Sequence, residues 1–192
     1  MQKRILLGLL AVAWISLGSQ VCLGQQVVHA LTGTLSATAP NAHTITVKTD
    51  DGSEGVFKDM EKTQTSISFD KGIEAQATPA DQFAKIGSHV IVYYFGDGDV
   101  RTAVAIKDLG SASTHKSSGT VTKFDRHQHL LTLKNDAGQT EEIGIGEQTS
   151  VDSSDGVIEG LKYKANRGDH MTVIWTAGSS NQNMALFIYA TE

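Results

Sequence analysis

Residues 33–57 read GTLSATAPNAHTITVKTDDGSEGVF, and residues 119–143 read GTVTKFDRHQHLLTLKNDAGQTEEI. The two stretches align without a gap at a spacing of 86 residues, and seven of the 25 aligned positions are identical. The identical pairs are Gly33/Gly119, Thr34/Thr120, His43/His129, Thr46/Thr132, Lys48/Lys134, Asp50/Asp136 and Gly52/Gly138. A repeat at a fixed spacing predicts two copies of one supersecondary unit.

Two shorter stretches extend the repeat towards the end of each copy. IGSHVIVYY (86–94) is similar to RGDHMTVIW (167–175), and TAVAI (102–106) is similar to MALFI (184–188). All three blocks occur in the same order in both copies, which favours a duplication.

The repeat divides the chain into two units joined by a short linker. We expect a first unit over residues 31–108, a linker over residues 109–118 and a second unit over residues 119–190. The linker is placed there because the small polar residues of GSASTHKSS bury little surface and bend freely.

Alternation of apolar and polar residues predicts the strands of each unit. It is clearest in residues 43–48 and in the aligned residues 129–134. The stretches 50–52 (DDG) and 136–138 (DAG) predict hairpin turns into a third strand, since glycine accepts a positive φ. The apolar residues of 90–94 predict a fourth strand, and a fifth follows it.

One short helix is expected in each unit, between the third and fourth strands. The clearest candidate is Pro79–Ile86, because proline suits a first helical turn and Gly87 suits the end. Three strands, a helix and two strands predict an all-β fold of two tandem five-stranded β-barrels, OB-like or SH3-like. A core of fewer than about 80 residues is thin, so we expect the barrels to pack together and bury part of one face of each.

Four short motifs carry a resemblance to a known family. They are Gly119-Thr-Val121, Leu131-Thr-Leu133, Gly168-Asp-His-Met-Thr-Val173 and Ala103-Val-Ala-Ile106. With them the chain resembles a bacterial family of exported, OB-like domains of unknown function over most of residues 31–190. The first unit departs from the family pattern at Ser88, where aspartate is usual. The resemblance implies a fold and an envelope location, but no activity and no catalytic residue.

Residues 1–24 have the features of a signal peptide. Lys3 and Arg4 precede the apolar run Ile5–Leu17, which is too short to span a bilayer but suits the apolar region of an export signal. We therefore expect a periplasmic or secreted protein that meets the membrane only through this transient segment.

Small residues at positions −3 and −1 determine where a signal peptide is cleaved. Cys22 and Gly24 predict cleavage after Gly24, and Val28 and Ala30 offer a second site after Ala30. The residues before Cys22 do not match a lipoprotein signal, so we expect no lipid anchor there. Cleavage after Gly24 leaves no cysteine, and 14 basic against 21 acidic residues then give a net charge of −7.

Charge and aromatic content argue against a nucleic-acid partner. The chain has 16 Lys and Arg against 21 Asp and Glu, and its pI is near 5.8. Nucleic acids call for a basic face with aromatic side chains on which bases stack. Residues 43–58 hold one aromatic residue, Phe57, and residues 129–145 hold none.

Histidines provide one pattern that suggests a metal site. His127 and His129 have a spacing that places both rings on one face of a strand, and with a third ligand such as His43 they could hold zinc or copper. The alternative places His127 in a hairpin turn and His129 at a strand start. His89 and His170 lie opposite apolar positions and are expected to face solvent. We predict no metal ligand and keep a His-based metal-binding protein as the alternative function.

The sequence shows no arrangement typical of catalysis. It has no Gly-x-Ser-x-Gly elbow and no Ser-x-x-Lys motif in a helical context. We predict no catalytic residue and no cofactor, and expect a non-catalytic binding or structural module of the bacterial envelope. Its partner would be an envelope protein, a glycan or a small ligand. An enzyme with a site between the barrels is a third hypothesis, which a deep pocket with converging ionisable groups would favour.

Overall fold

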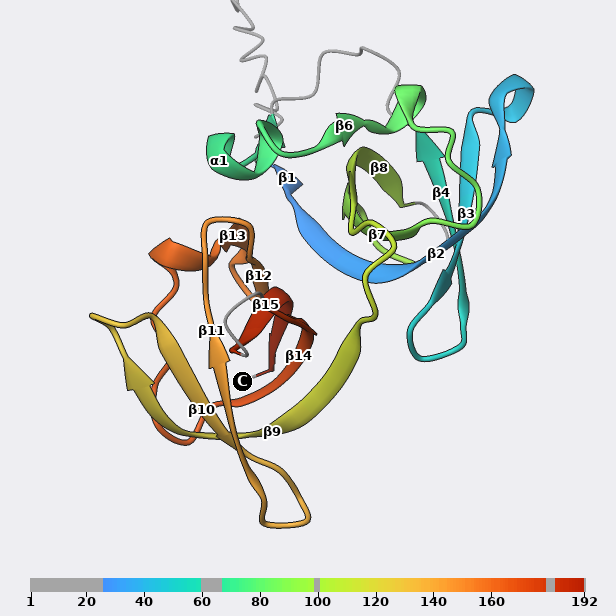
Figure 1. Cartoon of the computed structure of the whole chain (residues 1–192). Helices are drawn as coiled ribbons and strands as arrows, with labels where there is room; N and C mark the ends of the chain where they lie inside the picture. Colours follow the sequence, from blue (N-terminus) through green and yellow to red (C-terminus); the bar gives the residue numbers. More distant parts are fainter. Residues whose placement is uncertain (1–25, 60–66, 99–100, 179–181, 192) are drawn as a thin grey trace, which may run out of the picture.

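The computed structural model describes residues 26–59, 67–98, 101–178 and 182–191, and strands dominate these ranges. Figure 1 shows two groups of strands, with strand β9 leading from the first into the second. The predicted signal peptide, residues 1–24, lies outside the described residues. Within the described ranges, no helix is long and apolar enough to cross a membrane.

The first unit is a six-stranded sheet in the order β4-β3-β2-β7-β8-β6. β4 also pairs in parallel with β8, at Lys58–Thr102 and Asp59–Ala103, so five of the strands form a closed ring of pairings. The strands are β2 (His29–Ala39), β3 (Thr44–Thr49), β4 (Glu54–Asp59), β6 (Thr78–Pro79), β7 (His89–Phe95) and β8 (Thr102–Asp108).

The second unit is a seven-stranded sheet in the order β11-β10-β9-β14-β15-β12-β13. Its first five strands close in the same way, because β11 pairs in parallel with β15 at Ile143–Asn183 and Gly144–Met184. The strands are β9 (His115–Asp125), β10 (Leu130–Lys134), β11 (Thr140–Gly144), β12 (Ser150–Ser153), β13 (Gly156–Glu159), β14 (His170–Ala177) and β15 (Asn183–Thr191).

Short elements complete the described chain. β1 (Gln26–Val27) pairs in parallel with β5 (Ile67–Ser68), and α1 (Lys71–Glu74) is a single turn of α-helix. The Asp70 carboxylate caps α1 by accepting a hydrogen bond from the backbone N–H of Gly72 at 2.9 Å. Three 3-10 turns cover η1 (Pro40–Ala42), η2 (Ala80–Gln82) and η3 (Gly160–Lys162).

The predicted all-β class and the predicted hairpins are confirmed. In β3 the apolar Ile45 and Val47 are buried in alternation with more exposed residues, whereas in β10 Thr132 is buried together with Leu131 and Leu133. Gly52 and Gly138 take positive φ angles of 90° and 80° in the turns that follow these strands. Local pattern and turn chemistry therefore decide this part of both units.

The aligned residues occupy matching places in the two sheets. A Cβ atom on Gly33 would lie 2.4 Å from the backbone oxygen of Lys48, and one on Gly119 would lie 2.4 Å from that of Lys134. His43 and His129 both adopt the left-handed conformation, with φ of 51° and 49°. Several identical pairs of the repeat are thus positions where the backbone geometry restricts the residue type.

The predicted helix over Pro79–Ile86 is wrong. Thr78 and Pro79 pair with β8 instead, and only the 3-10 turn η2 follows. Phe83 is extended, with φ −90° and ψ 118°, and this conformation buries its ring in the core of the first unit. One short helix between the third and fourth strands is correct for the first unit, where α1 lies there, but the described part of the second unit holds only the 3-10 turn η3 at the corresponding place.

The predicted linker over residues 109–118 is shorter than expected, because β9 already begins at His115. Ser117 and Ser118 pair with β14, and their hydroxyl groups form hydrogen bonds to side chains of that strand. Ser118 Oγ lies 2.8 Å from Thr172 Oγ1, and the Trp175 indole N–H donates to Ser117 Oγ at 2.8 Å. Small polar residues can therefore form a strand when its neighbour supplies hydrogen-bond partners.

Three clusters of buried apolar side chains hold the molecule together. One belongs to the first unit and one to the second. The third lies between the units and confirms that they pack together. It consists of Val28, Ala30, Ile73, Ile91, Tyr93, Ala105, Val157, Ile174 and Phe187. Because β7 buries both its faces, the first unit supplies a core of its own and most of this junction.

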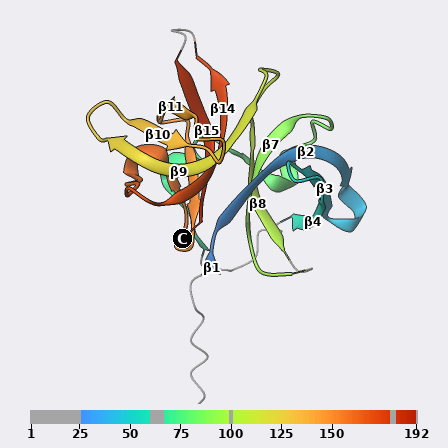
Figure 2. The ribbon, with the colours of Figure 1, turned by 90° about the horizontal axis from the view of Figure 1, so that it is seen from below.

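Polar contacts also cross the junction. The Tyr93 hydroxyl lies 2.7 Å from Ser150 Oγ, and the Val157 N–H donates to the Val28 carbonyl at 2.8 Å. Lys107 Nζ donates to the carbonyl of Gln148 at 2.6 Å. Figure 2 shows the two units lying side by side along this junction. The chain therefore presents a composite surface where the units meet.

Candidate ligand-binding groove between the units

A groove of about 390 Å³ runs along the junction. β2, β7 and the turn after β3 line it from the first unit, and β9, β14 and β15 line it from the second. Ile174 and Phe187 give it apolar walls, and Tyr94 and Tyr189 contribute aromatic rings. A volume of this size falls in the range of small-molecule sites.

A second hollow of about 440 Å³ adjoins the groove, and Tyr94 and Tyr189 line both. In it His29 Nδ1 of the first unit lies 3.1 Å from Asp152 Oδ1 of the second. Burial raises the pKa of Asp152, although the Ala30 N–H and His29 partly offset this effect. The buried carboxylate thus joins the units at one end of the groove.

Asp50 is the more buried of the two acids that line the groove, and its carboxylate contacts both Thr32 and His89. Its carboxylate accepts a hydrogen bond from Thr32 Oγ1, and His89 Nε2 lies 3.1 Å from Oδ1. Burial acts to raise the pKa of Asp50, but the bonds from His89 and Thr32, with the nearby charge of Lys116, bring it below the ordinary value. Asp50 is therefore ionised at neutral pH.

The second acid of the groove, Asp51, is engaged within its own turn. Its carboxylate accepts hydrogen bonds from the hydroxyl group of Thr49 and from both the N–H and the hydroxyl of Ser53. These bonds, that of Thr49 first, lower the pKa of Asp51 to about 2. A general acid or base working near neutral pH needs a pKa close to that pH, which neither Asp50 nor Asp51 has.

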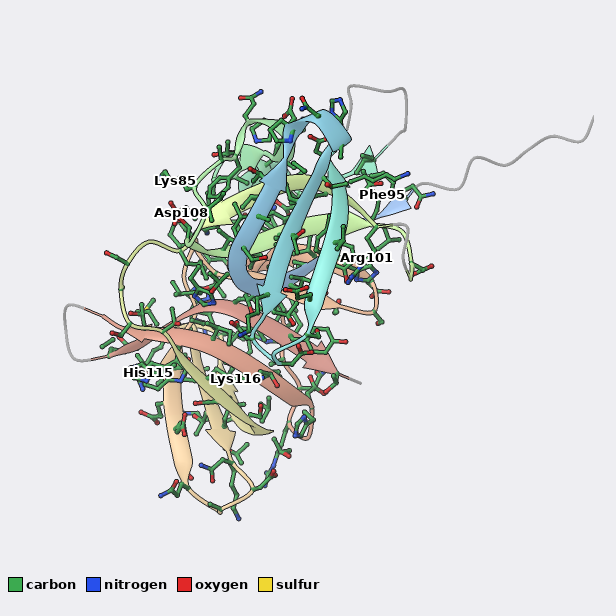
Figure 3. All side chains as sticks on the ribbon, turned by 90° about the vertical axis from the view of Figure 1, so that its right-hand side faces the viewer. Lys85, Phe95, Arg101, Asp108, His115 and Lys116 are labelled. Carbon is green, nitrogen blue, oxygen red and sulfur yellow. The ribbon has the colours of Figure 1, made fainter. Side chains whose placement is uncertain are left out.

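Arg101 is the cation of the groove in the first unit. Its Cζ lies 4.6 Å from the ring centroid of Phe57 and 5.7 Å from that of Tyr94, so two aromatic faces hold the guanidinium. Nε is buried without a hydrogen-bond partner. Lys116 of β9 lines the groove from the second unit, and Figure 3 shows both cations on the same side of the molecule.

The histidines predicted as possible metal ligands do not come together. His127 is exposed in the turn after β9, and His129 is half-buried immediately before β10. His43 Nδ1 lies 3.2 Å from Asp59 Oδ1 in the other unit. Among the described residues, no three His, Cys, Asp or Glu side chains are close enough to hold a metal ion.

The expectation that His89 and His170 both face solvent is correct for one of them. His170 is exposed, whereas the His89 side chain is only 19% exposed and contacts Asp50. His89 is partly covered because Asp50, in the turn after β3, brings its carboxylate to within 3.1 Å of the His89 ring. The pattern of β7 alone does not contain this contact.

The sequence does not point to the groove residues, because they are distant in the sequence and come from both units. Tyr94 belongs to the predicted fourth strand, and Arg101 and Tyr189 belong to no motif. One repeated pattern touches the site: His29 and His115 also lie 86 residues apart, and each pairs across strands with an aromatic residue, Tyr94 or Trp175, but only Tyr94 lines the groove and only His29 and Tyr94 line the adjoining hollow.

Comparison with known proteins gives no relative from which a function could be transferred. No protein-family model matches the chain, and no curated protein matches it significantly.

Proposed function

We propose that this chain is an exported, non-catalytic binding module of the bacterial envelope, and that its ligand site is the groove between the two units. The single observation that carries the proposal is the groove itself, where aromatic, apolar and charged side chains of both units converge around about 390 Å³. Pockets with this combination of walls are typical of small-molecule sites. The partner would then be a glycan or a small ligand rather than a nucleic acid.

We further infer that each unit is a small OB-like barrel and that the pair arose by duplication. Two rings of five strands, each closed by one parallel pair, support this reading. Matching contacts at Gly33 and Gly119 support a common origin. Together with the four short motifs of the sequence, these features are our basis for proposing that the chain belongs to the exported OB-like domains of unknown function.

A non-catalytic role is supported by the acids of the groove. Asp50 and Asp51 have pKa values below the ordinary one because hydrogen bonds stabilise their charged forms. Groups of this kind bind and orient a ligand, but they are poor proton donors or acceptors at neutral pH.

Cleavage of the signal peptide after Gly24 leaves the cluster between the units intact, whereas cleavage after Ala30 would remove part of it. Val28 and Ala30 are 2% and 3% exposed and belong to the cluster between the units. Cleavage after Ala30 would remove both, together with the Val28 carbonyl that accepts from Val157. Expression of the full chain in a bacterium, followed by mass analysis of the exported form, should give Gln25 as the first residue; Leu31 would contradict this.

Thermal unfolding of the exported form against a ligand panel tests the site. The panel holds neutral sugars, glycan fragments, polyamines, and zinc, copper, nickel and calcium with and without chelator. A ligand at about 100 times its dissociation constant adds about 2.7 kcal/mol to stability. For a chain of this length, that raises the midpoint by roughly 5–10 °C.

A matched pair of variants locates the binding. Tyr189 is 46% exposed in the groove and Ile86 is 61% exposed in the first unit, outside the groove lining. We expect Tyr189→Ser to reduce the ligand-induced shift and Ile86→Ser to preserve it. An equal shift in both variants would place the site elsewhere. A chelator-sensitive shift would instead support the metal-binding alternative.

A further inference from the structure

The two acids that line the groove have hydrogen-bonding partners within the protein, whereas one of its cations has no acidic partner. Asp50 is bonded to His89 and Thr32, and Asp51 is bonded within its own turn. Lys116 lies near enough to both acids to lower their pKa values. The two carboxylates therefore already have partners, and the remaining cation of the groove is Arg101.

Arg101 has no acidic partner in the described chain. No carboxylate oxygen of the described residues lies within 4.0 Å of its guanidinium, whose side-chain hydrogen bond is to the neutral Tyr94. Its Nε is one of two buried side-chain polar atoms without a hydrogen bond in these residues; the other, Asp59 Oδ1, faces His43 at 3.2 Å. A partly buried cation without a carboxylate partner is costly, so an anionic group that a ligand brings to the part of the guanidinium lining the groove would be favoured.

The neighbours of Arg101 fix its position and leave most of its donors free: a hydrogen bond links it to Tyr94. The rings of Phe57 and Tyr94 hold the guanidinium by their faces, whereas hydrogen bonds leave its edge. Beyond it the groove continues over Tyr189 and Phe187 of the second unit. A bound molecule would meet a charged end in the first unit and an aromatic wall in the second.

We propose that the groove binds a small organic carboxylate. Its carboxylate would pair with the Arg101 guanidinium, and its apolar or sugar-ring body would lie against Tyr94, Tyr189 and Phe187. The planar fork of arginine matches a carboxylate with two parallel hydrogen bonds, which makes it selective for this group. This inference rests on the proposed function, since it names the ligand class of the same groove.

The Arg101 Nε–H group offers a direct readout. The chain has four arginines, Arg4, Arg101, Arg126 and Arg167, and cleavage of the signal peptide would leave three. Their Nε–H signals are few enough to be resolved in a 15N-labelled sample and assigned by substitution. The exported form is titrated with two matched pairs, glucuronate against glucose and benzoate against benzyl alcohol. The pairs distinguish an acidic sugar from an aromatic acid as the source of the carboxylate.

We expect one of the acids to shift the Arg101 Nε–H signal and to bind at least ten-fold more tightly than its neutral partner. Arg101→Gln should weaken binding at least ten-fold, and Arg101→Lys, which keeps the charge but loses the fork, should weaken it less. Arg126 is exposed in the turn after β9, so Arg126→Gln is the matched control and should leave binding unchanged. Thermal unfolding of each variant establishes that it is folded before its binding is compared.

Three results would overturn the inference. Equal binding of an acid and its neutral partner in the groove would refute the carboxylate while leaving the proposed binding site in place. Acid binding that survives Arg101→Gln would place the anion elsewhere. If neither acid binds up to about 10 mM, the inference fails. The ligand panel and the Tyr189→Ser variant then decide separately whether the groove binds anything.

Discussion

The two units share one framework and differ in the segment that joins their third and fourth strands. Both keep the ring of five strands and the tight glycine at its start, Gly33 or Gly119. In the first unit, the described part of this segment is β5, α1, β6 and η2; in the second it is the hairpin β12–β13 followed by η3. These unrepeated segments contribute Ile73, Ser150 and Val157 to the junction. Repeated residues thus build the sheets, and unrepeated ones help to join them.

Two identical pairs of the repeat, Asp50/Asp136 and His89/His170, show how position changes a residue's role. Asp50 and His89 are 3.1 Å apart in the first unit. Their aligned counterparts, Asp136 and His170, make no contact with each other in the described structure, and His170 lies by Thr191 instead. Of these four residues only Asp50 lines the groove, where Lys116 also lies. The groove is therefore a property of the assembled pair and not of either unit.

The largest effect is expected at Tyr93, which is completely buried between the units. Tyr93→Ala removes the ring and the bond to Ser150, and loss of such a core aromatic costs about 4 kcal/mol. Denaturant unfolding should show this loss. Unfolding followed by the fluorescence of Trp175, in the second unit, should also cease to coincide with unfolding followed by circular dichroism. A loss below about 1 kcal/mol with coincident curves would show that the junction contributes little.

The next effect tests whether the two frameworks are equivalent. Gly33→Ala and Gly119→Ala would each push a Cβ atom to 2.4 Å from a backbone oxygen, and we expect each to cost about 3 kcal/mol. Gly146→Ala is the control, because its Cβ would meet only the flexible end of Met184, at 3.4 Å. Equal losses for Gly33→Ala and Gly119→Ala support equivalent frameworks, and a loss in one alone would contradict this.

A third effect concerns the lysine that joins the units. Burial lowers the pKa of Lys107 to about 8, from 10.5. Between pH 8 and 10 the unfolded chain therefore holds a proton that the folded chain has lost, so the free energy of unfolding rises with pH. Relative to Lys107→Met, the wild type should gain about 2 kcal/mol over this range in denaturant unfolding. If the free energy of unfolding depends on pH in the same way in both proteins, the lowered pKa of Lys107 would be contradicted.

The smallest effect is expected for acid stability, where Asp50 and its repeat counterpart Asp136 should behave differently. The pKa of Asp50 is lowered, so its contribution is present above pH 4 and is lost as the pH falls through the folded-state value. Asp50→Asn should reduce the fall in stability below about pH 4 by about 1 kcal/mol or less. Asp136 is exposed, and Asp136→Asn should leave the acid profile unchanged. Identical profiles for both variants would mean that the His89 contact adds no stability.

The sequence was informative where the physics is local. Alternation at Ile45 and Val47 and the glycines of the turns predicted the hairpins, because each depends on neighbouring residues alone. The helix over 79–86 failed because burying Phe83 requires an extended backbone there, which is a tertiary demand. The groove could not be predicted for the same reason: Arg101 and Tyr189 carry no local signal, and only the packing of two units brings them together.

Amide chemical-shift mapping tests the central claim most directly, namely that both units form one ligand site. The 15N-labelled exported form is titrated with the compound that raises the unfolding midpoint most. We expect the shifted signals to come from both sides of the groove, from Leu31 and Asp50 in the first unit and from Lys116 and Thr172 in the second. Shifts confined to one unit, or centred on His127 and His129, would contradict the claim.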